Sequence, residues 1–276
     1  MVNLIPIYIF ENNMLRKCFG IISWFPTTEP VRIERQERIN RLLSQLNKLW
    51  PTIDILIIAQ NWQDFKPIEI SNNIIIKEYP ELGILGARRA LREAFLALDY
   101  DYIIMFDDDA IVEYKDNTYI TFMEEIDKHP KGFCFIHGNN SRYHPYCAAQ
   151  LNLCAISRYI YEKEPMVDID PQKNEGFEDS IYACLLHHKW GKYEFNPPLG
   201  IRCVQFSNPK LHATSTWVGS CEGKRPFRTM VENTDRIQKY IAENKAFPAS
   251  YKQMIKEYKP PIDNPADGRK GSYLYF

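Results

Sequence analysis

Short apolar runs along this chain alternate with stretches whose apolar residues recur every three or four positions. The apolar runs, which are typical of buried strands, cover residues 19–25, 53–59, 74–77 and 102–106. Helical spacing of apolar residues occupies residues 39–50 and 87–98. Strands that alternate with helices predict an α/β fold, in which mostly parallel strands form an open sheet with helices on both faces.

The second half of the chain follows this pattern less regularly. We predict a strand at residues 132–136, a passage from strand to helix at 150–162, and a helix at 179–189, which ends before Gly191. We therefore expect one α/β domain at residues 1–222, followed by a C-terminal helical extension and tail at residues 223–276.

The charge balance excludes several classes of protein. The 34 Lys and Arg residues nearly match the 35 Asp and Glu residues, the net charge is −1, and 45% of the residues are hydrophobic. These values are those of an ordinary globular protein and not of a disordered chain. No basic excess is present to neutralise phosphates, so we expect no nucleic acid as a partner.

The cysteines and the N-terminus bear on location. The seven cysteines include no C-x-x-C pair, which predicts buried thiols in a reducing, cytoplasmic compartment. The N-terminal apolar stretch at residues 4–10 contains Pro6 and runs into Glu11, so we expect neither a signal peptide nor a transmembrane segment of about 20 residues. Peripheral attachment to a membrane stays open, although no polybasic helix predicts it.

Three consecutive carboxylates, Asp107, Asp108 and Asp109, directly follow the apolar run at residues 102–106. Ligands of open α/β sheets bind at this carboxyl edge of the strands. Alternation along an extended chain points Asp107 and Asp109 to the same side, where two like charges repel each other unless a cation lies between them. Oxygen ligands favour Mg²⁺ or Mn²⁺. The alternative is a turn that these residues cap in solvent, because Asp is common in turns.

Residues 83–112, GILGARRALREAFLALDYDYIIMFDDDAIV, resemble the GT-A glycosyltransferases, and within them the inverting family 2 type. The resemblance implies a GT-A, Rossmann-like fold and a nucleotide-sugar donor. It also implies that Asp107 contacts the ribose or the metal, and that Asp109 ligates the Mn²⁺ or Mg²⁺ ion that bridges the donor diphosphate. Arg88 would face that diphosphate or the sugar at the start of its helix. The alternative for Arg88 is an exposed helix cation.

A second block, Gly176-Phe177-Glu178-Asp179, is similar to the segment of that family that starts a helix with an E-D pair. A carboxylate at a helix N-terminus is held ionised by the helix dipole. By resemblance, Asp179 is the base that takes the proton of the acceptor hydroxyl, and Glu178 orients the acceptor. The alternative is a helix N-cap with a neighbouring acid.

The resemblance also implies a third metal ligand and a pocket for the base. His212 lies near the place where many proteins of this fold supply a histidine ligand. At the end of the second strand, an aspartate that reads the base is often present in the family, but this chain has Gln60 and Asn61. Either amide can bond to uracil, and the identity of the nucleotide stays open. Phe25 and Pro26 would form the adjacent wall, or equally belong to the core.

These features together predict a metal-dependent, inverting hexosyltransferase that uses a nucleotide-sugar, with UDP expected, and a saccharide or glycoconjugate acceptor in bacterial surface polysaccharide synthesis. One alternative is a sugar-1-phosphate nucleotidyltransferase. That class usually carries a glycine-rich, lysine-containing first loop, whereas residues 24–28 here are WFPTT. A second alternative is a glycan-binding module that kept the fold without turnover.

Overall fold

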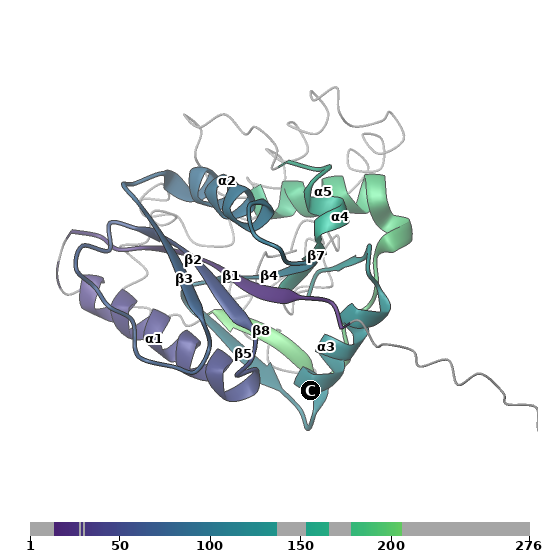
Figure 1. The fold of residues 1–276 in the computed structure, drawn as a ribbon, viewed down its shortest axis with the longest axis horizontal. Coiled ribbons are helices and arrows are strands. Elements are labelled where there is room, and N and C mark those ends of the chain that lie inside the picture. Colours follow the sequence, from purple (N-terminus) through teal and green to yellow (C-terminus); the bar gives the residue numbers. More distant parts are fainter. Residues whose placement is uncertain (1–13, 28, 30, 137–152, 166–177, 206–276) are drawn as a thin grey trace, which may run out of the picture.

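The computed structural model describes residues 14–27, 29, 31–136, 153–165 and 178–205. Within these ranges, the centre of the protein is a six-stranded sheet of order β3-β2-β1-β4-β7-β6 (Figure 1). The strands are β1 (Lys17–Trp24), β2 (Asp54–Gln60), β3 (Ile74–Tyr79), β4 (Tyr102–Asp107), β6 (Phe133–Cys134) and β7 (Cys154–Ser157). The four strands from β3 to β4 are parallel to one another, and β7 is antiparallel to both of its neighbours.

Helices cover both faces of this sheet (Figure 1). On one face lie α1 (Val31–Leu49), α3 (Thr118–Lys128) and a second, antiparallel sheet of β5 (Ala110–Tyr114) and β8 (Ile201–Gln205). The other face packs against α2 (Gly83–Leu96), α4 (Arg158–Tyr161) and α5 (Glu178–Trp190), which the 3-10 helix η2 (Gly191–Tyr193) follows. Successive side chains of the central strands alternate between the two faces, so both faces bury apolar residues.

This architecture confirms the predicted fold class, an α/β protein with a mostly parallel open sheet flanked by helices. The strands and helices that we predicted between residues 19 and 106 are present with shifted ends. Four described elements, β5, α3, η2 and β8, were not predicted, although α3 has apolar residues at Phe122, Met123 and Ile126 with helical spacing. The proposed extension at residues 223–276 lies outside the described residues.

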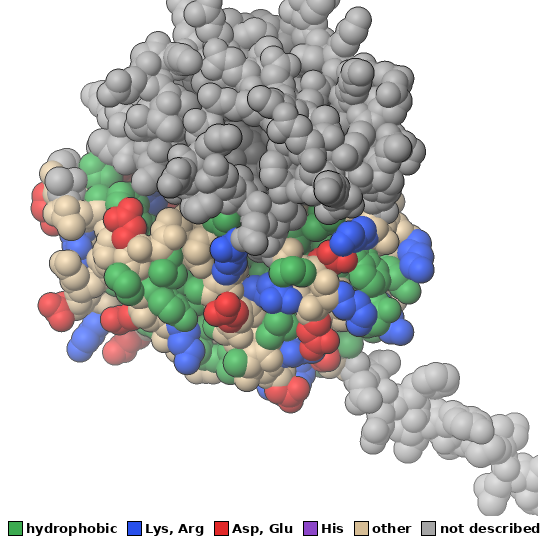
Figure 2. Space-filling view, turned by 90° about the horizontal axis from the view of Figure 1, so that it is seen from above, with side chains coloured by type: hydrophobic (Ala, Val, Ile, Leu, Met, Phe, Trp, Pro, Cys, Tyr) green, Lys and Arg blue, Asp and Glu red, His purple; other side chains and the backbone are tan. Residues whose placement is uncertain are grey.

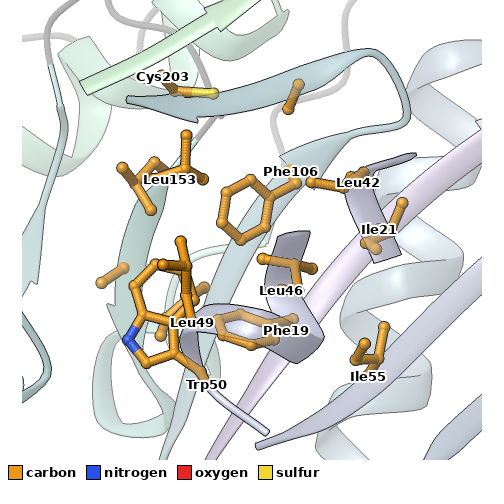
Figure 3. Close-up of a cluster of buried hydrophobic side chains, with 14 of the residues drawn as sticks. Phe19, Ile21, Leu42, Leu46, Leu49, Trp50, Ile55, Phe106, Leu153 and Cys203 are labelled. Atoms are coloured by element: carbon orange, nitrogen blue, oxygen red, sulfur yellow. The ribbon is translucent and has the colours of Figure 1, made fainter. Parts of the chain in front are cut away.

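The core on the α1 side is built around aromatic rings. The ring centroid of Phe19 lies 5.4 Å from that of Trp50 and 5.6 Å from that of Phe106. Figure 3 shows these rings among leucines of α1, with Leu42 and Leu46 close to Phe106 and Phe19. Because Phe106 immediately precedes the acidic residues, this packing fixes the end of β4 from which they emerge.

The outside of the protein agrees with its balanced composition. In Figure 2, acidic and basic side chains are intermixed over the part of this face that the structure describes. Among the described helices, none combines the length and the apolar character that crossing a lipid bilayer requires.

Phe19→Ala is expected to lower the free energy of unfolding by about 3–5 kcal/mol, because the change removes a buried ring and leaves a cavity. Urea denaturation measures this loss. Ile33→Ala is the control, since Ile33 is 49% exposed, and its effect should stay within about 0.5 kcal/mol. Similar losses for the two variants would contradict the described packing.

Candidate functional site

The carboxyl ends of β1 and β4 lie side by side at the point where the connections of the sheet change direction. The connection from β1 to β2 runs through α1 on one face, and the connection from β3 to β4 runs through α2 on the other face. In the register of β1 and β4, Ile22 pairs with Asp107. Open α/β sheets bind ligands in the crevice at such a switch point. The acidic residues 107–109 therefore occupy the expected position of a ligand site.

Asp108 is the most enclosed of the three acids and anchors the turn. Its Oδ2 accepts a hydrogen bond of 2.8 Å from Ser23 Oγ on β1, and its Oδ1 accepts a longer one of 3.4 Å from Arg35 Nη1 on α1. Burial raises the pKa of Asp108 above its ordinary value, and the Arg35 charge and the Ser23 hydrogen bond offset only part of this effect. Asp108 thus ties the turn to a neighbouring strand and to a helix.

Asp107 pairs with a buried arginine. Arg88 Nη2 on α2 donates a hydrogen bond of 2.5 Å to Asp107 Oδ1, and Arg88 is only 1% exposed. This burial contradicts the alternative of an exposed helix cation. The contact of Arg88 with a donor diphosphate stays a prediction, because the described contact is with Asp107.

Asp109 has the least compensated carboxylate. Its Oδ2 lies 3.8 Å from Arg38 Nη1, with 18% of the side chain exposed. Its Oδ1 is buried and has no hydrogen-bond partner among the described residues. Burial, and then the charges of Asp107 and Asp108, raise the pKa of Asp109 to about 7 despite the opposing effect of Arg38. Ionising this group in the folded protein is therefore costly unless a further positive charge approaches.

The donor set of this turn fits a divalent cation that phosphates help to bind. Among the described residues, no group of three or more His, Cys, Asp or Glu side chains is arranged to hold a metal. Mg²⁺ sites in nucleotide-dependent enzymes use one or two carboxylates together with the phosphates of the substrate. The buried Oδ1 of Asp109 is a carboxylate oxygen of this kind. The predicted third ligand, His212, lies outside the described residues.

Phe25 and Pro26, which were expected to form a wall for the base or to belong to the core, follow the end of β1. The Phe25 ring is fully buried and stacks on Trp62 with 5.2 Å between the ring centroids, and Pro26 is buried as well. The rings of Phe25, Trp62 and Phe65 pack against one another near the end of β1, as the core alternative predicts. A contact of Phe25 or Pro26 with a base stays a prediction. These residues support the edge of the sheet from within the core.

Gln60 and Asn61 end β2 at the same edge. The Oε1 of Gln60, which is buried, accepts a hydrogen bond of 2.7 Å from the backbone N–H of Leu82. Asn61 is half-buried, has a left-handed φ of 56°, and its carbonyl oxygen accepts a hydrogen bond of 3.4 Å from Arg32 Nη1. Since Gln60 is engaged with the segment before α2, Asn61 is the better placed of the two to meet a base.

The acid pair of the second block lies at the start of a helix, as predicted. Helix α5 begins at Glu178, so Glu178 and Asp179 are both in its first turn. Their side chains lie outside the described part of the structure, and their distance from the acidic turn stays untested.

The residues that pair with the acids, Ser23, Arg35 and Arg38, were not among the predicted site residues. A signal was present, because arginines recur every third residue at 32, 35, 38 and 41. Such spacing places a basic row along one side of α1. The sequence alone did not indicate that this row borders the acidic turn.

The comparisons with known proteins identify no family for this chain. No protein-family model matches the sequence, and no curated protein matches it. Among solved structures, A197 from STIV shares 14% identity over 70% of this chain and 87% of its own, with a TM-score of 0.41. A putative glucose-1-phosphate thymidylyltransferase from Bacillus anthracis, solved in complex with a sucrose, shares 11% identity over 78% of this chain and 99% of its own, with a TM-score of 0.46. At these values, neither likeness bears on function.

Asp109→Asn is expected to stabilise the metal-free protein at neutral pH by up to about 4 kcal/mol. A carboxyl whose pKa is higher in the folded than in the unfolded state binds its proton more tightly when folded. Stability is therefore lost as the pH rises from the ordinary pKa of 3.8 to the folded value of about 7. The variant has no such loss, so its advantage should be absent near pH 4, grow as the pH rises to about 7, and be complete above that pH.

Urea denaturation with a chelator at both pH values measures this difference. Asp99→Asn is the control, because the Asp99 side chain is 95% exposed, and it should keep the pH dependence of the wild-type protein. A pH dependence of Asp109→Asn equal to that of the wild type would contradict the burial of this charge.

Proposed function

We propose that this protein is a metal-dependent glycosyltransferase, which moves a hexose from a nucleotide-sugar to a hydroxyl group of a glycan. The observation that carries the proposal is the acidic turn at the switch point, in which Asp109 Oδ1 is buried without a hydrogen-bond partner among the described residues. This oxygen suits a cation that a diphosphate also binds. The resemblance of residues 83–112 and 176–179 to family 2 glycosyltransferases supports the same function, with UDP as the expected nucleotide.

On the donor side, Asp109 holds the Mn²⁺ or Mg²⁺ ion, and His212 is the further ligand that the resemblance implies. The cation, when bound, offsets the negative charge that builds up on the leaving diphosphate. Asp107 contacts the ribose or the metal, while Arg88 orients the Asp107 carboxylate through their hydrogen bond. Asn61, at the end of β2, bonds to the base.

On the acceptor side, Asp179 takes the proton of the attacking hydroxyl group, and Glu178 orients the acceptor. The first turn of a helix favours the ionised form of a carboxylate, which is the form that a base requires. The acceptor oxygen attacks the anomeric carbon opposite the leaving diphosphate, so the configuration of the sugar inverts. The acceptor class expected from the resemblance is a bacterial surface polysaccharide or glycoconjugate.

A sugar-1-phosphate nucleotidyltransferase is the second candidate, because an acidic cation site at the same edge of the sheet would serve that reaction as well. The first loop argues against it. Between β1 and α1 the sequence FPTTEP contains neither glycine nor lysine, which are the residues that a loop for a triphosphate would use.

Product analysis with labelled substrates separates the two functions. A glycosyltransferase releases UDP from UDP-sugars in the presence of Mn²⁺, whereas a nucleotidyltransferase releases pyrophosphate from a nucleoside triphosphate and a sugar phosphate. We expect UDP release, and we expect Asp109→Asn to reduce it at least about 100-fold, because the cation loses its carboxylate ligand. Asp99→Asn should keep full activity.

Two results would contradict this assignment. Pyrophosphate release without sugar transfer would favour the nucleotidyltransferase, and full Mn²⁺-dependent transfer by Asp109→Asn would remove Asp109 from the metal site. Saccharide binding by calorimetry, with neither reaction and no affinity for a donor, would favour a glycan-binding module.

A further inference from the structure

A chain of buried hydrogen bonds links the acidic turn to the loop that follows β2. Trp62 Nε1 donates a hydrogen bond of 3.2 Å to Ser23 Oγ, and Ser23 Oγ donates one of 2.8 Å to Asp108 Oδ2. All three residues are buried. Since Trp62 follows β2, Ser23 lies on β1 and Asp108 follows β4, the chain connects the carboxyl ends of three strands.

Two arginines of α1, Arg35 and Arg32, bind the two ends of this hydrogen-bond chain, Asp108 and Trp62. Arg35 donates to the other oxygen of Asp108 and lies over the Trp24 ring, with 5.3 Å between its Cζ atom and the ring centroid. Arg32 donates a hydrogen bond of 2.7 Å to the backbone carbonyl of Trp62 and weaker ones to the carbonyls of its two neighbours. The loop after β2 and the acidic turn are therefore fixed against the same helix.

Burying the polar residues of this hydrogen-bond chain costs free energy that packing alone does not require. A buried carboxylate and a buried hydroxyl lose their hydration, and apolar residues of similar volume stabilise a core at least as well. The polar residues instead fix the orientation of side chains, because each hydrogen bond restrains the orientation of its partners. Asp108 lies between the two acids assigned to the donor, so its orientation sets theirs.

We propose that Asp108 is a positioning residue, which Ser23 and Trp62 orient, and that this chain holds Asp107 and Asp109 in the geometry that binds the cation. The inference rests on the proposed function and adds residues that touch neither cation nor substrate. The same hydrogen bonds connect the segment that contains Asn61 to the cation site. A substitution at Trp62 should therefore alter the orientation of Asp109.

Mn²⁺ titration with detection of free Mn²⁺ by electron paramagnetic resonance, in the presence of UDP, tests this inference without any turnover. Ser23→Ala removes the hydroxyl, and we expect it to weaken Mn²⁺ binding about 10-fold, as is typical when a partner of a metal ligand is lost. Trp62→Phe removes only the indole donor and keeps an aromatic ring, so it should weaken binding by a smaller factor. Ser23→Thr keeps the hydroxyl and should bind like the wild type.

Trp50→Phe is the matched control. The indole N–H of Trp50 also donates a hydrogen bond, which is part-buried and measures 3.1 Å to the carbonyl oxygen of Tyr119. Trp50 follows the C-terminal end of α1, away from the acidic turn. This variant should lose stability to a similar extent as Trp62→Phe, with unchanged affinity for Mn²⁺. Melting temperatures of all variants separate a loss of binding from a loss of folding.

The outcomes distinguish the inference from the function on which it rests. Weaker Mn²⁺ binding by Ser23→Ala and Trp62→Phe, with Trp50→Phe and Ser23→Thr unaffected, supports the positioning role. If Ser23→Ala and Trp62→Phe bind Mn²⁺ as tightly as Trp50→Phe, the inference is wrong while the cation site stands. A wild-type protein that binds no Mn²⁺ with UDP would overturn the proposed function itself.

Discussion

Three adjacent carboxylates at the end of a buried strand create an electrostatic problem that the surrounding structure must solve. Asp107 is neutralised by Arg88 of α2, and Asp108 by Arg35 of α1 together with the Ser23 hydroxyl. The Oδ2 of Asp109 lies 3.8 Å from Arg38 Nη1, and its Oδ1 has no hydrogen-bond partner among the described residues. Burial, and then the charges of Asp107 and Asp108, raise the pKa of Asp109 to about 7, because the nearby arginines offset only part of these effects. A ligand that brings positive charge to this turn would complete the compensation.

The topology of the sheet places arginines of two helices next to the acidic turn. Because α1 and α2 lie on opposite faces, their arginines approach the same turn from two sides, at the switch point between β1 and β4. The aromatic packing of Phe106 with Phe19 below the turn fixes the end of β4. The acids are thus held by a core on one side and by paired charges on the others, which leaves little freedom for the turn to rearrange.

The sequence predicts the central sheet well, because β1, β2 and β4 are mostly apolar and the helical spacing of α1 and α2 is regular. The direction of β7 could not be predicted, since hydrophobic periodicity does not encode the route by which the chain returns to β4. The acidic site was visible because Asp107–Asp109 follow an apolar run. Its partners Ser23 and Arg35 were not visible, because they meet Asp108 only after the chain has folded. Phe25 was expected either at the site or in the core, since an aromatic residue near the end of a strand suits both positions, and its ring is buried.

Nuclear magnetic resonance of the isotope-labelled protein with Mn²⁺ and UDP tests most directly where the cation binds. A paramagnetic ion broadens the amide signals of nearby residues, so the signals of residues 106–110 should disappear first. Those of Tyr100 and Ser157, which lie at or beyond the opposite end of β4, should persist. Broadening that begins elsewhere, or that affects the whole protein evenly, would contradict a cation site at Asp109.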